Sequence, residues 1–260
     1  MRLACISDLH FDHNIGLLPV LEDRVKKLRP DVLVLGGDLF NGSSRLGAIL
    51  KRIKDIVPRL LFVPGNHDLW LTETAGTLNS SVLYTEVLRG IALRSGVDYL
   101  GNMPVIIGNT AFVGITGWYD AFPSGDKHSP DEKLCIFPGL DTPIDVVSWQ
   151  CELLKKQFKE VPETIERIVV VCHTVPFLSL VKDMVPDDIL SYQGSDRLGE
   201  TILSEKRVRH IFSGHLHRCF FHADVGNGVN WESVACGYSR EWDKPMDEHI
   251  SETLRLIELH

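Results

Sequence analysis

Aspartate, asparagine and histidine residues recur in five short motifs along the chain, and each motif directly follows an apolar run. Side chains of these types bind metal ions and, for histidine, transfer protons near neutral pH. A surface turn would use Gly, Asn and Asp for their backbone tolerance, but it would not need the histidines. In chain order the residues are Asp8 and His10; Asp38 and Asn41; Asn66, His67 and Asp68; His173; and His215 and His217.

The donor atoms of these residues favour particular metals. Carboxylate, amide oxygen and imidazole occur together without a thiolate, which suits borderline-to-hard divalent ions such as Mn, Fe or Zn. Asp8 and His10 are two residues apart, as are His215 and His217. Alternate residues of an extended segment point the same way, so each pair presents two ligands on one face. The motifs therefore predict a metal site.

The elements that carry these motifs alternate between strands and helices. Near-continuous apolar runs rich in β-branched residues indicate strands buried on both faces. Between the first three runs, residues 17–28 and 45–56 place apolar residues three and four apart, with charges between them, which is typical of surface helices. The runs cover residues 2–7, 31–37, 59–65, 167–173 and 210–215.

Two hairpins and a final strand indicate a second sheet packed on the first. Residues 104–118 form two β-like runs joined by a Gly-Asn dipeptide that suits a tight turn. The runs 218–225 and 229–237 flank a Gly-Asn-Gly turn in the same way, and residues 254–259 have the pattern of a last strand.

Two irregular stretches, 119–143 and 174–198, match neither pattern. Long loops in compact domains are usually functional or mobile, so we expect substrate specificity to depend on these two stretches.

The position of the polar motifs at strand ends explains how distant residues can meet. In open α/β sheets, ligands bind in the crevice outside the carboxyl ends of the strands. Five strand ends that carry Asp, Asn or His therefore predict one site rather than five separate turns.

Composition restricts the remaining possibilities. The chain has 260 residues and a net charge of -8, and we expect one domain over residues 1–260. The acidic charge argues against extended nucleic acid as a main partner, because phosphate backbones bind clustered Lys and Arg. The six cysteines show no C-x-x-C pair, so they indicate reduced thiols. No signal-like segment or membrane-length apolar run is present, and we expect a cytoplasmic protein without a membrane partner.

The five motifs together resemble those of the calcineurin-like metallophosphoesterase superfamily. D-x-H, G-D-x-x-N, G-N-H-D, a lone His after an apolar strand and G-H-x-H occur in this order between Asp8 and His217. The resemblance implies an α/β fold, a four-layer αββα sandwich of two mixed sheets flanked by helices, with a two-metal site at the carboxyl ends of the strands.

The resemblance also implies which residues hold the two ions. Asp38 would bridge them, since a carboxylate has two oxygens. One ion would be held by Asp8, His10, Asp38 and His217, and the other by Asp38, Asn66, His173 and His215.

The implied reaction is hydrolysis of a phosphate mono- or diester. A hydroxide shared by two ions about 3.5–4 Å apart would attack phosphorus. His67 would bind a phosphate oxygen or protonate the leaving alkoxide, a task for which histidine suits near pH 7. Asp68 is its neighbour in sequence and a candidate to orient it.

Four further residues are candidates to support the site or contact the substrate. Asn41 occupies a position where the family often has Asp, and it is expected to support the ligands. His13, Trp70 and Arg218 lie close in sequence to motif residues.

Two alternatives stay open at this point. The same site could belong to a nuclease or a cyclic-nucleotide phosphodiesterase, although no basic, aromatic-interleaved stretch accompanies it. The fold could instead serve as a non-catalytic interaction scaffold, but every expected ligand position is filled. We expect a small-molecule phosphate ester as the substrate; the sequence gives no indication of the oligomeric state.

Overall fold

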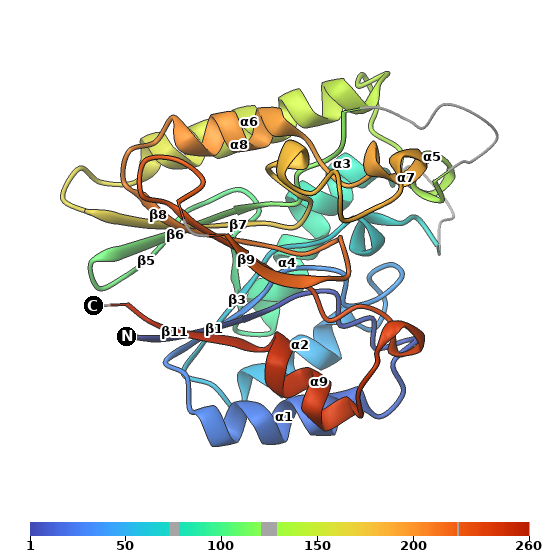
Figure 1. The fold of residues 1–260 in the computed structure, drawn as a ribbon, viewed down its shortest axis with the longest axis vertical. Helices are drawn as coiled ribbons and strands as arrows, with labels where there is room; N and C mark the ends of the chain where they lie inside the picture. Colours follow the sequence, from blue (N-terminus) through green and yellow to red (C-terminus); the bar gives the residue numbers. More distant parts are fainter. Residues whose placement is uncertain (73–77, 121–128, 223, 260) are drawn as a thin grey trace.

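The computed structural model describes residues 1–72, 78–120, 129–222 and 224–259. Two β-sheets lie in the middle of the molecule, with helices on their outer sides (Figure 1). Helices α1 (Leu17–Leu28), α2 (Leu46–Lys54) and α9 (Met246–Thr253) cover the first sheet, and α6 (Pro143–Glu160) and α8 (Asp196–Leu203) cover the second. This is the four-layer αββα arrangement predicted from the sequence.

The first sheet has the strand order β11-β1-β2-β3-β4. Its strands β1 to β4 are parallel, and β11 pairs antiparallel with β1, which brings the two chain termini together at one edge (Figure 1). The bounds are β1 Arg2–Ile6, β2 Val32–Leu35, β3 Arg59–Phe62, β4 Asp98–Tyr99 and β11 Arg255–Glu258.

The second sheet has the order β5-β6-β7-β8-β10-β9. Its four central strands are parallel, and the two edge strands are the antiparallel partners supplied by the predicted hairpins. The runs at 167–173 and 210–215 thus belong to this sheet and not to the one containing the first three runs. The bounds are β5 Val105–Ile107, β6 Thr110–Ile115, β7 Arg167–Cys172, β8 Val208–Ser213, β9 Cys219–His222 and β10 Asn230–Val234.

The longest helix, α6, begins with clear local signals. The Thr142 side chain accepts a hydrogen bond from the Asp145 backbone, the Asp145 carboxylate accepts one from the Thr142 backbone, and Pro143 occupies the first helical position. Such a capping box stabilises a helix start, and proline loses nothing there because that amide would be unpaired anyway. The shorter helical segments are η1 (His67–Leu69), α3 (Ser80–Val82), η2 (Leu83–Val87), α4 (Leu88–Arg94), α5 (Asp131–Leu134), η3 (Leu178–Leu180), α7 (Asp187–Leu190) and η4 (Ser239–Glu241).

Strand side chains alternate between two apolar layers. In β1, Leu3 and Cys5 lie in the layer between the sheets, whereas Ala4 and Ile6 join the core beneath the helices. From the other sheet, Phe112, Val169 and Phe212 are among the residues that fill the layer between the sheets. Burial on both faces explains why these strands are continuous apolar runs.

The two sheets are joined at their carboxyl ends. Ser7, directly after β1, forms an isolated parallel bridge with Ala235, directly after β10. The Ser7 amide donates to Val234 O at 3.0 Å, and the Cys236 amide donates to Ser7 O at 2.8 Å. The polar motifs that follow the strands of both sheets therefore meet at one edge of the molecule.

The two irregular stretches surround this edge. The stretch 119–143 contains α5 and the stretch 174–198 contains α7, and both elements lie near each other in Figure 1. Residues 121–128 of the first stretch lie outside the described residues. Within the described chain, no helix has the length and apolar character needed to cross a membrane.

Candidate active site

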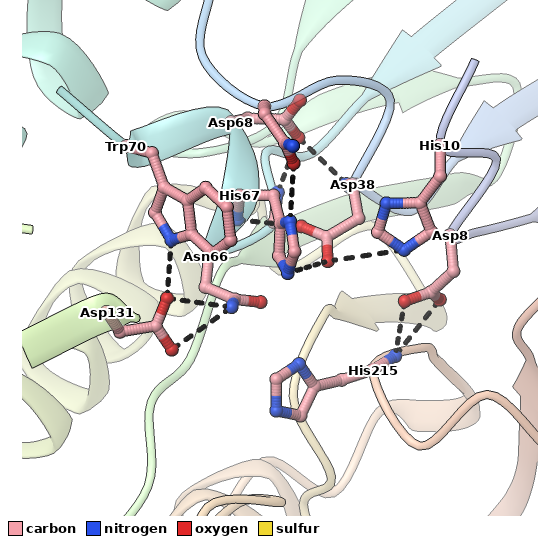
Figure 2. Close-up of polar contacts among 12 residues, drawn as sticks. Asp8, His10, Asp38, Asn66, His67, Asp68, Trp70, Asp131 and His215 are labelled. Carbon is pink, nitrogen blue, oxygen red and sulfur yellow. Dashed lines mark hydrogen bonds and ion pairs between the residues drawn. The ribbon is translucent and has the colours of Figure 1, made fainter. Parts of the chain in front are cut away.

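All seven predicted metal ligands gather where the two sheets are joined, and Figure 2 labels five of them. They come from the ends of β1, β2, β3, β7 and β8. Their burial is unusual for polar groups: Asp8, His10 and His173 are 0% exposed, Asp38 is 1% exposed and Asn66 is 2% exposed. Buried charges need partners or a metal, so this concentration calls for an explanation.

The first group of donors consists of Asp8, His10 and His217, whose ligand atoms lie within 4.8 Å of one another. The Nε2 atoms of His10 and His217 are 3.1 Å apart. The Nε2 atom of His217 is 3.5 Å from Asp8 Oδ1.

The second group consists of Asp38, His173 and His215, again within 4.8 Å. His173 Nε2 lies 3.4 Å from Asp38 Oδ2 and 3.1 Å from the amide oxygen of Asn66. The same Asp38 oxygen is 3.9 Å from His10 Nε2 in the first group. Asp38 therefore stands between the two groups, where the sequence predicted a shared carboxylate.

Three of the four histidines have their other ring nitrogen held by the protein. His173 Nδ1 donates to Gly36 O at 2.8 Å, and His215 Nε2 donates to Tyr192 O at 2.9 Å. His217 Nδ1 donates to the Glu241 carboxylate at 2.8 Å. Such outer contacts fix the tautomer and leave the opposite nitrogen free to bind a metal.

Glu241 and Tyr192 were not identified from the sequence. Glu241 lies in a short segment after β10, 24 residues beyond the histidine that it contacts. Tyr192 contributes only its backbone oxygen to His215. A single sequence carries no signal for either contact.

The donor set fits divalent cations. Several electron-pair donors face one another within this cluster, and His10 Nδ1 is buried without a hydrogen-bond partner among the described residues. Burial disfavours charge on His173, but attraction to Asp38 and Asp8 outweighs it and raises the pKa of His173 to about 10. Burial would raise the pKa of Asp38, yet the facing His173 and His67 hold that pKa well below its usual value. The centre of the cluster thus favours positive charge.

The backbone is strained at the candidate ligands. Among the described residues, eight that are not glycine have positive φ, and five of these are candidate ligands. The pairs Asp8/His10 and His215/His217 are therefore not extended, as the sequence suggested, but left-handed. Such angles are uncommon outside glycine, and backbone strain of this kind clusters at functional sites. The five are Asp8 (57°), His10 (38°), Asp38 (55°), His215 (67°) and His217 (54°).

The motif glycines allow the strand ends to approach one another. A Cβ atom on Gly65 would lie 2.0 Å from Asp38 Oδ1, and one on Gly214 would lie 2.3 Å from Asp8 Oδ2. Neither position can hold a side chain without displacing a carboxylate. The glycine of G-N-H-D is therefore needed for this close contact with Asp38.

His67 is held on two sides. Its Nδ1 atom donates to the amide oxygen of Asn41 at 2.7 Å, and the Trp70 ring stacks on it with a centroid distance of 3.8 Å and an interplanar angle of 26°. Its Nε2 atom lies 3.8 Å from Asp38 Oδ2 (Figure 2). Asn41 also donates to His13 Nε2 at 3.1 Å, so His13 reaches His67 only through Asn41.

Asp68 has a different set of contacts from the one expected. Its carboxylate accepts hydrogen bonds from the backbone amides of Asp38 and Gly65, each at 2.8 Å, and from Leu39 at 3.2 Å. Burial and the charge of Asp38 raise the pKa of Asp68 to about 7. In the structure Asn41 makes the orienting contact to His67, and Asp68 fixes the loop that carries Asp38.

Asp131 is a buried carboxylate that the sequence did not single out. It is 4% exposed and accepts from Asn66 Nδ2 at 3.0 and 3.1 Å and from Trp70 Nε1 at 2.5 Å (Figure 2). It therefore turns the Asn66 amide so that its oxygen faces His173. Asp131 lies in the stretch 119–143, which had no readable pattern.

A cleft of about 620 Å³ opens over the cluster. Trp70, as predicted, is among its lining residues, together with Tyr238, whose ring stacks on His10 at 4.3 Å. Arg218 is exposed and is not one of the lining residues, and the same holds for His13.

Comparison with known proteins identifies the family. The family model for calcineurin-like phosphoesterases matches residues 1–219. The chain belongs to the calcineurin-like phosphoesterase family. This confirms the family predicted from the five motifs, and the two-sheet fold described above is the one expected for it.

Two curated proteins match parts of this calcineurin-like chain. The acyl-carrier-protein phosphodiesterase PptH of Mycobacterium tuberculosis is 34% identical over 70 residues, which are 27% of this chain and 21% of PptH. The DNA double-strand break repair protein Mre11 of Nanoarchaeum equitans is 24% identical over 128 residues, 42% of this chain and 35% of Mre11. The matched segments thus span about a fifth and about a third of these relatives.

Solved structures with the same fold cover nearly the whole chain. The crystal structure of the phosphopantetheinyl hydrolase PptH from M. tuberculosis superposes with a TM-score of 0.79 at 21% identity, covering 98% of this chain and 95% of PptH. The protein TT1561 of Thermus thermophilus gives a TM-score of 0.53 at 14% identity, covering 90% of this chain and 88% of TT1561. At these identities the likeness establishes the fold alone.

Proposed function

We propose that this calcineurin-like chain is a dinuclear metal-dependent phosphodiesterase built as one domain over residues 1–260. The observation that carries the proposal is the convergence of two groups of donors, one with Asp8, His10 and His217 and one with Asp38, His173 and His215. Asp38 stands between them, because it also forms a group with His10 and His67. One ion would be held by Asp8, His10, Asp38 and His217, and the other by Asp38, Asn66, His173 and His215. One apolar layer shared by the two sheets supports the single domain.

Mn, Fe or Zn is the proposed metal. The donor set is carboxylate, amide oxygen and imidazole, and no cysteine belongs to the metal-binding groups found among the described residues. Two divalent ions supply charge neutralisation of the phosphate and an activated water near neutral pH.

The residues around the ions have distinct roles in this proposal. His67, oriented through Asn41 and stacked on Trp70, donates a proton to the leaving oxygen or binds a phosphate oxygen. Its Nδ1 is occupied by Asn41, so Nε2 is the atom that acts. A positioned general acid contributes about 10²–10⁴-fold to the rate.

Preference for a diester over a monoester is supported by the charges of the cleft. The described residues that line the cleft include no Lys or Arg, whereas Asp131 and Glu241 are among them. Sites for dianionic phosphate commonly use guanidinium or ammonium groups to bind the second charge. A diester carries a single negative charge, which the two ions can neutralise.

The relative PptH suggests which natural diester to test first. Its names describe a phosphodiesterase of acyl carrier protein and a phosphopantetheinyl hydrolase. We propose a phosphopantetheine diester as the first natural candidate for this chain. Mre11 is named as a DNA repair protein, and the absence of Lys and Arg from the described cleft lining speaks against DNA here.

The proposal is tested by stripping the protein of metal, refilling it with manganese, and measuring hydrolysis of p-nitrophenyl phosphate and bis-p-nitrophenyl phosphate side by side. We expect metal-dependent activity with a preference for the diester. Asp38→Asn and His215→Ala should abolish hydrolysis, with an unchanged circular dichroism spectrum showing that the fold persists.

Three outcomes would contradict parts of the proposal. Preference for the monoester would indicate a phosphatase rather than a diesterase. Full activity in both Asp38→Asn and His215→Ala would show that the proposed metal site does not take part in hydrolysis. Hydrolysis of neither substrate would favour a non-catalytic scaffold.

A further inference from the structure

One wall of the cleft is apolar and comes from the stretch between β7 and α8. Val185, Ile189 and Tyr192 line the cleft there, and Leu216 continues the wall between the two ligand histidines that follow β8. Ile189 belongs to the short helix α7, next to α5 in Figure 1. A continuous apolar surface beside a cluster of metal-binding side chains is suited to bind an apolar group of the ligand.

This wall is attached directly to the metal-binding cluster. The stretch returns to the sheet by pairing Val175 with Gly194, with the Val175 amide donating to Gln193 O at 2.9 Å and the Ser195 amide donating to Val175 O at 3.0 Å. A Cβ on Gly194 would lie 1.8 Å from Val175 O, so only glycine permits this contact. Because the chain pairs with Val175 at Gly194, the nearby Tyr192 carbonyl oxygen is placed to accept a hydrogen bond from His215 Nε2 at 2.9 Å. A group bound to a metal ion at His215 therefore lies beside the wall.

Among the described residues, the charges around the wall disfavour an anionic ligand group. Asp131 and Glu241 line the same cleft, and the cleft lining within the described chain contains neither Lys nor Arg. Arg240 lies outside this lining, with its guanidinium 4.3 Å from the ring centroid of Tyr238. A carboxylate or second phosphate on the arm would face Asp131 and Glu241, with no Lys or Arg among the described lining residues to compensate its charge.

We propose that Val185 and Ile189 form a subsite for an uncharged, extended arm esterified to the phosphate, so that the substrate is a diester with one such arm. This inference rests on the proposed function and specifies its substrate class. The ligand residues would hold the ions that neutralise the phosphate, His67 would act at its ester oxygen, and the wall selects the arm by burying its apolar surface.

The test measures binding rather than turnover. Manganese-loaded protein is titrated calorimetrically with dimethyl phosphate, dibutyl phosphate and bis(3-carboxypropyl) phosphate. These diesters are symmetrical, so the result does not depend on which arm enters the subsite. We expect dibutyl phosphate to bind about tenfold more tightly than dimethyl phosphate, because the three further methylenes of the arm in the open subsite lose part of their contact with water. The carboxylate-bearing diester should bind more weakly than dimethyl phosphate.

Variants connect the effect to the wall. Ile189→Ser and Val185→Ser should each remove most of the advantage of the butyl arm. Leu180→Ser is the matched control, since Leu180 is 45% exposed and is not among the residues lining the cleft. It should leave the tenfold difference unchanged.

The outcomes separate this inference from the proposed function. Equal affinity for dimethyl and dibutyl phosphate, in protein that hydrolyses bis-p-nitrophenyl phosphate, would overturn the subsite alone. So would tight binding of the carboxylate-bearing diester, or a tenfold difference that survives both wall substitutions. No binding of any diester, together with no hydrolysis, would overturn the diesterase proposal and the subsite with it.

Discussion

The Nδ1 atom of His67 donates a 2.7 Å hydrogen bond to the amide oxygen of Asn41, and this contact determines which nitrogen of the ring can act on a substrate. The Trp70 ring, stacked at 3.8 Å, fixes the plane of the imidazole. A general acid must present its proton in one direction, so both contacts contribute to the geometry of His67.

Replacing Asn41 by alanine should slow turnover about tenfold at saturating manganese, since an unoriented acid loses part of its roughly 10²–10⁴-fold contribution. The loss should grow with the pKa of the leaving group, measured with a series of aryl phosphate diesters. Asn41→Asp keeps an acceptor for His67 Nδ1 and serves as the matched variant. Equal slowing for good and poor leaving groups would argue against an acid oriented by Asn41.

Asp131→Asn should weaken manganese binding by about 10–100-fold, which is the usual effect of losing a partner that orients a metal ligand. Asp131 accepts both hydrogen bonds of the Asn66 amide group, at 3.0 and 3.1 Å, and an amide at position 131 cannot do so in the same way. The measurement is a calorimetric manganese titration, followed by kcat at saturating manganese, which should recover to near the wild-type value.

Tyr119→Phe provides the control for Asp131, because the Tyr119 hydroxyl donates to the same carboxylate at 3.3 Å, whereas the contacts that orient Asn66 are made by Asn66 itself. Its manganese affinity should stay close to that of the wild type. Unchanged manganese affinity in Asp131→Asn would show that Asp131 stabilises only the loop and not the ligand.

Glu241→Gln should lower manganese affinity about tenfold at one of the two ions. The carboxylate accepts from His217 Nδ1 at 2.8 Å and from the Tyr238 amide at 2.9 Å. A glutamine keeps the shape of the side chain but is a weaker acceptor for the histidine. Electron paramagnetic resonance of the manganese-loaded protein would report loss of the coupled pair of ions.

The matched control removes the same charge elsewhere. Glu248 is exposed on α9, and Glu248→Gln should leave both manganese ions in place. If both substitutions reduced manganese binding equally, the effect would be one of net charge and not of the Glu241–His217 contact.

The sequence predicts the site well for residues that directly follow a strand. The helix predicted at 17–28 is observed at Leu17–Leu28, and each of the five apolar runs overlaps a strand. The motif residues end up together because parallel strands bring their carboxyl ends to one edge. The sequence could not show which strand belongs to which sheet. The strands β7 and β8 of the second sheet are as apolar as β1 to β3 of the first, because both sheets are buried on both faces.

Residues that support the site through long-range contacts escaped sequence reasoning. Asp131 reaches Asn66 across 65 positions, and Glu241 reaches His217 across 24. Neither follows a strand or belongs to a periodic pattern, and an acidic residue in an irregular stretch is ordinarily a solvated one. For Asp68 the sequence suggested a contact that is not made. Asp68 is next to His67 in the chain, but its carboxylate points to the backbone amides of Asp38 and Gly65 instead.

A last prediction concerns stability away from the site, at the ion pair that joins α1 to α2. The Glu22 carboxylate accepts from Arg52 Nη2 at 2.8 Å, and the Glu22 side chain is 11% exposed.

This hydrogen bond lowers the pKa of Glu22 below its ordinary value of 4.5. A lowered folded-state pKa means that the stabilisation is present above about pH 4.5 and is lost as the pH falls through the folded value. Glu22→Gln should therefore lower the Tm by about 2 °C at pH 7, and this difference should shrink as the pH falls below 4.5. Asp23→Asn, an exposed neighbour on the same helix, is the control. A Tm difference for Glu22→Gln that did not shrink below pH 4.5 would trace the loss to packing of the side chain and not to its charge.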